Sequence, residues 1–172
     1  MHSKYSDGMC TTPSLTEIED SEFDALKTRI ESRPRLCGYY ILGLVSIREF
    51  RDSNATQESI LEHVINYFDD DPTEPDPNFV SDHGWVDYET DHDRARAHAI
   101  ESLVGGSQIG HTRHTMTELQ AAKAFDEFLN LCGPNPRFYI GMGIGDRKYV
   151  FQYGVLIVAN SRGGMLWVVE SD

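Results

Sequence analysis

Short connections between strand-like segments constrain the fold of this chain more than any other feature of its sequence. Three runs near the C-terminus, at 137–144, 149–159 and 165–170, are rich in β-branched and aromatic residues and predict strands. Turn-forming residues at 145–146 and 161–164 separate these runs. Because a parallel crossover needs about a dozen residues or more, neighbours joined so closely must be antiparallel. The C-terminal third is therefore expected to form a three-stranded antiparallel meander.

Helical periodicity predicts about four helices before this meander. In three of these segments, apolar residues recur at helical spacing and define one face that can pack against a sheet, while the segment at 91–104 is predicted from capping residues at its start and two glycines at its end. The expected helices cover about 21–33, 56–68, 91–104 and 117–131. A short aromatic and aliphatic run at 39–47 predicts a buried strand between the first two helices. The chain is thus expected to be an α+β protein, with about four helices packed on a mainly antiparallel sheet.

Two polar segments define the expected domain organisation. Residues 1–13 are rich in Ser, Thr and Gly, which predicts a disordered tail. Residues 69–78 contain three prolines and five acidic residues, which predicts an extended, exposed, acidic Pro-rich loop. Because this loop is too short to indicate a second domain, residues 14–172 are expected to form a single α+β domain.

The charge distribution limits the classes of partner. The chain has a net charge of −13, and residues 1–93 carry 21 acidic against 7 basic residues. Such a field disfavours nucleic acid, whose binding needs Lys and Arg, and it disfavours an anionic membrane surface. It attracts a basic protein surface or a divalent cation. The longest apolar runs, 39–47 and 155–159, are far shorter than the ~18 residues that span a bilayer.

Three widely spaced cysteines bear on the cellular compartment. Cys10, Cys37 and Cys132 are odd in number and form no CxxC motif, so no disulfide framework is indicated. The N-terminal residues lack the apolar stretch of a secretory signal. We therefore expect a cytoplasmic protein, and its oligomeric state stays open. No Ser or Cys has an identifiable partner that would activate it as a nucleophile, so no catalytic residue is assigned.

The strongest candidate site is an acidic surface beside aromatic residues. Between Asp69 and Asp93 the chain has ten acidic residues and no Lys or Arg. Aromatic anchors within a field of one sign are typical of an electrostatically steered protein–protein contact. The predicted partner-binding residues are Asp69, Asp70, Asp71, Glu74, Asp76, Phe79, Trp85 and Tyr88. The alternative is that the aromatic residues belong to the core while the acidic residues are only solvated.

A second candidate is a histidine cluster. His111 and His114 are three residues apart, and His98 precedes them on the third expected helix. That spacing can bring imidazoles to one metal ion, and neutral imidazole suits zinc. This pattern supports an alternative function, a metal-dependent hydrolase in which a bound zinc ion activates water. The other interpretation is a solvated loop whose histidines carry no metal.

The segment at 117–129, followed by a Gly-Pro turn and a strand, resembles that of some bacterial immunity proteins. Those proteins are small acidic cytoplasmic domains that block a toxin, so the resemblance implies an inhibitor. The leading hypothesis is therefore a small acidic interaction protein, in one form an inhibitor or immunity-type protein, that binds a basic partner protein. A second alternative is a structural or assembly protein that associates through its C-terminal strand, which the sequence places either at an edge or at the centre of the sheet.

Overall fold

The protein folds into a six-stranded antiparallel sheet with helices on both faces, as predicted for an α+β chain. The computed structural model describes residues 15–35, 38–68, 87–105, 116–142 and 151–170. Its helices are α1 (Ser21–Glu31), α2 (Arg48–Asp52), α3 (Gln57–Phe68), α4 (His92–Gly105) and α5 (Glu118–Cys132). Its strands are β1 (Thr16–Glu17), β2 (Gly38–Ser46), β3 (Glu89–Thr90), β4 (Arg137–Ile140), β5 (Phe151–Val158) and β6 (Arg162–Glu170).

The strands lie in the order β1-β2-β6-β5-β4-β3, and every neighbouring pair is antiparallel. Strands β4, β5 and β6 follow one another along the chain and across the sheet, which confirms the predicted meander. Strand β6 pairs with β2 on its other side, so it is a central strand. Both edges of β6 are hydrogen-bonded, so this strand has no open edge for pairing, and the assembly function stays a prediction.

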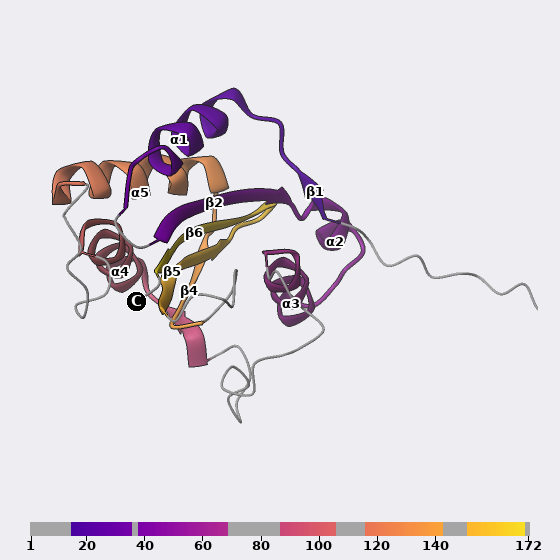
Figure 1. Ribbon diagram of the computed structural model, residues 1–172. Helices are drawn as coiled ribbons and strands as arrows, with labels where there is room; N and C mark the ends of the chain where they lie inside the picture. The colour runs from indigo at the N-terminus through magenta and orange to yellow at the C-terminus, as the bar shows by residue number, and fades with distance from the viewer. Residues whose placement is uncertain (1–14, 36–37, 69–86, 106–115, 143–150, 171–172) are drawn as a thin grey trace, which may run out of the picture.

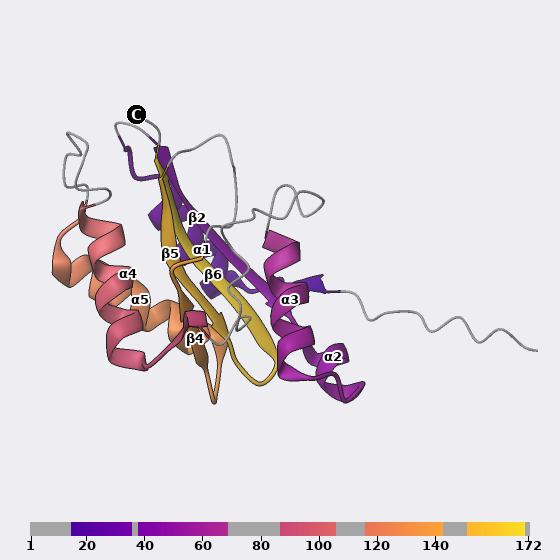
Figure 2. The same ribbon diagram turned by 90° about the horizontal axis from the view of Figure 1, so that it is seen from below.

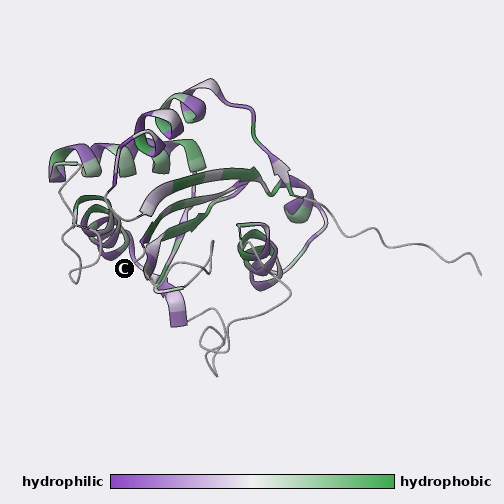
Figure 3. Cartoon of the chain, in the orientation of Figure 1, coloured by the Kyte–Doolittle hydropathy of each residue, from purple (hydrophilic) through white to green (hydrophobic). Residues whose placement is uncertain are grey.

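The sheet separates two hydrophobic cores. Helices α1, α4 and α5 cover one face, while α2 and α3 cover the other (Figures 1 and 2). Because side chains alternate along a strand, Leu166 and Val168 of β6 enter the first core, while Met165, Trp167 and Val169 enter the second. The helices turn their hydrophobic sides toward the sheet and their polar sides outward (Figure 3). This amphipathic pattern explains why the sequence predicted the long helices well.

Two details differ from the sequence-based expectation. The short helix α2 raises the number of described helices from about four to five. Strand β6 also begins at Arg162, within the predicted turn, so Gly163 and Gly164 lie inside the strand. A β-carbon on Gly164 would lie 2.7 Å from Cys132 Sγ, and one on Gly163 would lie 3.0 Å from Val64. Both glycines are therefore packing positions that let α5 and α3 approach the sheet.

Two of the domain predictions lie outside the described residues. The predicted tail at 1–13 and the whole acidic loop at 69–78 belong to this part of the chain. Within the part that is described, no helix is both long enough and apolar enough to cross a membrane.

Candidate functional site

Helix α3 leads directly into the acidic segment, and its outer face is acidic as well. Glu58 and Glu62 are exposed, and the helix has no Lys or Arg. The region without a basic residue is in fact longer than 69–93. It runs from residue 52 to residue 93 and includes 13 acidic residues. The acidic surface thus begins on a well-ordered helix that packs against the second core.

Four arginines elsewhere on the described surface form ion pairs with acidic side chains. These ion pairs are Arg29–Glu127, Arg96–Asp126, Arg137–Glu89 and Arg162–Asp20. By contrast, Glu58 and Glu62 have no ion-pair partner among the described residues. Unpaired carboxylates contribute to the long-range field more fully than neutralised pairs do. The unpaired carboxylates of α3 therefore add to the negative charge of the acidic segment that follows this helix.

An exposed aromatic residue, Tyr67, lies in the last turn of this helix. Tyr67 is 45% exposed, and only Leu119 among the other described large hydrophobic side chains is also exposed. The next residue, Phe68, packs against the second core over Gly43, where the strand has no side chain to oppose it. The Tyr67 and Phe68 rings meet edge to face with centroids 5.3 Å apart. Phe68 therefore fixes the end of the helix, and Tyr67 remains exposed two residues before Asp69.

Most of the predicted partner-binding residues lie outside the described part of the chain. They are Asp69, Asp70, Asp71, Glu74, Asp76, Phe79 and Trp85. Tyr88 is described and is half-buried against the second core. Its ring lies close to Gly141, where an added β-carbon would be 3.8 Å from Tyr88 Cδ1. Tyr88 therefore takes part in packing as well as lying within the acidic segment.

The structure describes one of the three predicted metal ligands. His98 is on α4, and its Nε2 atom is buried with no hydrogen-bond partner among the described residues. Burial lowers the pKa of His98 below its ordinary value; Glu101 opposes this shift, and Arg94 adds to it. His111 and His114 lie outside the described residues, and within the described part no three His, Cys, Asp or Glu side chains form a metal-binding group. The zinc site and the hydrolase function remain predictions.

A buried ion pair closes one end of the sheet, and the sequence did not indicate it. Arg35 Nη2 donates to Glu170 Oε1, and the two side chains are only 1% and 4% exposed. The Tyr153 hydroxyl donates to Glu170 Oε2. The Arg35 guanidinium lies over the Tyr40 ring, 4.7 Å from its centroid. Burial alone would lower the pKa of Arg35, but Tyr40 and Glu170 together raise it above its ordinary value.

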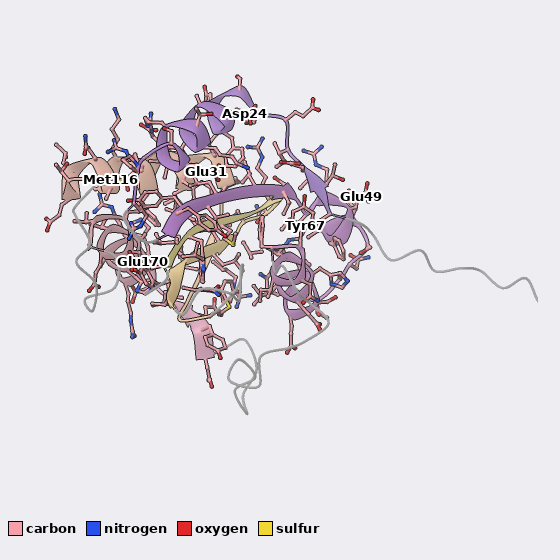
Figure 4. The ribbon with its side chains drawn as sticks, viewed as in Figure 1. Asp24, Glu31, Glu49, Tyr67, Met116 and Glu170 are labelled. Carbon is pink, nitrogen blue, oxygen red and sulfur yellow. The ribbon has the colours of Figure 1, made fainter. Side chains whose placement is uncertain are left out.

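This cluster ties the segment after α1 to the end of β6, on the α4 side of the molecule in Figure 4. Its buried charges neutralise each other, and the two Glu170 oxygens are both hydrogen-bonded. The pair links residues 135 positions apart, so no local motif could have predicted it. Tyr67, in contrast, could have been found from the helical spacing of 56–68, which leaves it beside the buried stripe.

The thiol of Cys132 is unreactive. It is fully buried between α5 and β6, and burial raises its pKa well above the ordinary thiol value. A protonated, inaccessible thiol is neither a nucleophile nor a metal ligand.

Comparison of the chain with protein-family models, curated proteins and solved structures finds no match.

Proposed function

We propose that this protein is a small acidic interaction protein that binds a basic partner protein through α3 and the acidic segment after it. One form of this function is inhibition, in which the acidic surface covers the working surface of a basic enzyme or toxin. The predicted contact residues are those of the acidic segment, with the exposed Tyr67 added from α3. The observation that carries the proposal is the 42-residue stretch from 52 to 93, which has 13 acidic residues and no basic one.

Electrostatic steering and burial of aromatic side chains would make separate contributions to binding at this surface. Unpaired carboxylates steer a basic partner during diffusion and can raise association rates from about 10⁵–10⁶ to about 10⁸–10⁹ M⁻¹s⁻¹ at low salt. Because the Debye length is only about 8 Å at physiological ionic strength, salt should weaken this steering. Aromatic side chains then supply the affinity, because they bury a large apolar area when the partner covers them. Tyr67 suits this second role, since it is already ordered and exposed.

The first test replaces the five acidic residues of the loop by their amides. The protein is used to isolate a basic partner at low salt, and association is then measured with that purified partner. We expect the loop variant to associate about tenfold more slowly and to depend less on salt. The substituted residues are Asp69, Asp70, Asp71, Glu74 and Asp76.

A matched control removes the same number of charges from exposed positions on other elements. Its substituted residues are Glu17, Glu19, Asp24, Glu101 and Glu118. If net charge alone matters, both variants will slow association equally, and a local site is excluded. Failure to retain any basic protein would also end the proposal.

A second test separates affinity from steering. Tyr67→Ala should raise the dissociation rate by about tenfold or more, as expected when an aromatic anchor is truncated. Its association rate should change little, because the substitution removes no charge. Leu119→Ala is the matched control, since Leu119 is the other large hydrophobic residue that is exposed in the described ranges and lies on α5, across the sheet. Equal dissociation rates for the two variants would remove Tyr67 from the site.

A further inference from the structure

A groove of about 390 Å³ lies between α1 and α5, on the opposite face of the sheet from α3. The two helices run next to each other above the sheet in Figure 1. Ala25 and Leu26 of α1 and Leu131 of α5 give the groove apolar walls. A volume of this size falls within the range of small-ligand sites, about 300–1,000 Å³.

The cationic groups around this groove are already engaged by other groups. Arg29 pairs with Glu127 at one end of the groove. Arg162 pairs with Asp20, its Nη1 atom lying 3.4 Å from Oδ2, and donates to the Leu131 carbonyl oxygen at 2.8 Å. These contacts leave no unpaired arginine in the described lining.

Two polar groups of the lining stay unengaged. Neither the Glu22 carboxylate nor the Asn130 side-chain amide has a hydrogen-bond or ion-pair partner among the described residues. The C-terminal end of α5 and the N-terminal end of α1 meet beside the groove, and Arg162 already bridges them through the Leu131 carbonyl and Asp20. The groove therefore presents one exposed carboxylate and one exposed side-chain amide, neither bonded within the described part of the protein, beside apolar walls.

We propose that this groove binds an arginine side chain presented by a partner protein. The methylene stem would lie against Ala25, Leu26 and Leu131, and the guanidinium would donate to Glu22 and to the Asn130 side-chain oxygen. Arginine fits better than lysine, because its planar fork can donate to two acceptors at once. Arg162 gives a precedent in the same molecule, since its guanidinium already donates to the Leu131 carbonyl at the end of α5.

The site goes beyond the proposed function, because it uses neither α3 nor the acidic segment. Its test is an NMR titration of the full ¹⁵N-labelled chain with N-acetyl-arginine methylamide. We expect saturable shifts of backbone amides in α1 and α5, with affinity in the millimolar range. The citrulline analogue has the same shape without the charge and should produce no saturable shift. Equal binding of both compounds, or no saturable shift with either, would overturn the proposal.

Two substitutions locate the binding within the groove. Ala25→Phe fills the groove from an exposed helical position, so it should abolish binding while the amide spectrum stays dispersed. Glu22→Gln should weaken binding about two- to fivefold, the effect of one exposed ion pair. Glu118→Gln is the matched control, because Glu118 is likewise a first-turn acidic residue, on α5.

If Glu22→Gln and Glu118→Gln have the same effect, Glu22 serves only the helix dipole and the assignment is wrong. Because the probe is a single capped residue, a negative result here leaves the α3 surface untouched. Loss of partner binding in the loop variant tests the α3 surface alone. The groove is tested only by the titration with the arginine compound.

Discussion

Removing one member of the buried Arg35–Glu170 pair should destabilise the protein strongly. Arg35→Met leaves a carboxylate that is 4% exposed, and Glu170→Gln leaves a guanidinium that is 1% exposed. An uncompensated buried charge of this kind costs about 3–5 kcal/mol. Since a domain is stable by only about 5–15 kcal/mol, each single variant should lose a large share of its free energy of unfolding.

The double variant should behave differently from the sum of its parts. Arg35→Met with Glu170→Gln removes both charges, and the new amide oxygen can still accept from the Tyr153 hydroxyl. Because replacing a whole buried pair is often close to neutral, we expect the double variant to lie within about 2 kcal/mol of the wild type. The two single effects sum to about 6–10 kcal/mol, so the double variant should fall short of additivity by about 4 kcal/mol or more.

Urea unfolding followed by circular dichroism gives the free energy of unfolding of the wild type, the two single variants and the double variant. With a slope of about 2 kcal/mol per molar urea, each single variant should shift the midpoint down by about 1.5–2.5 M. Asp126→Asn is the matched control, because it breaks the exposed pair with Arg96 and should cost less than about 1 kcal/mol. Single variants that cost no more than this control, or a double variant equal to their sum, would refute the reasoning.

Three further predictions follow from the packing, the histidine and the caps. Gly164→Ala should cost about 1–3 kcal/mol, because its β-carbon would lie 2.7 Å from Cys132 Sγ. Gly105→Ala is the control, because its β-carbon meets nothing within 4 Å and should not destabilise the fold. Thermal unfolding compares the two variants. Burial lowers the pKa of His98, so the folded state binds this proton less well than the unfolded chain does. Stability should be full above pH ~6.5 and fall as the pH drops toward the folded pKa, and His98→Gln should flatten that fall in melting curves. Thr117→Ala removes the capping box of α5 and should cost about 1 kcal/mol, whereas Thr117→Ser should cost much less in the same urea assay.

The candidate sites divide according to how local their signals are. The acidic stretch and its aromatic residues are visible in the sequence because charge and composition need no tertiary contact. The environment of Tyr67 depends on Phe68 packing over Gly43, which brings α3 onto a strand from an earlier part of the chain. The α1–α5 groove depends on two helices that are about a hundred residues apart. Spatial proximity of that kind leaves no trace in local spacing.

The sequence by itself determined the elements and the local topology of this protein. Apolar residues at helical spacing specified α1, α3 and α5, since each helix needs one face to bury, and terminal signals specified α4. Short connections specified the antiparallel order of β4, β5 and β6.

Only the tertiary structure decided where β2 lies and which residues meet there. Strand β2 pairs with β6 along its whole length, from Gly38 opposite Glu170 to Ser46 opposite Arg162. This pairing makes β6 central, buries Arg35 against Glu170, and turns Gly163 and Gly164 from predicted turn residues into contacts for helices. Local propensity cannot specify it, because its free energy comes from burying both faces of the sheet at once and is shared among residues far apart in the chain.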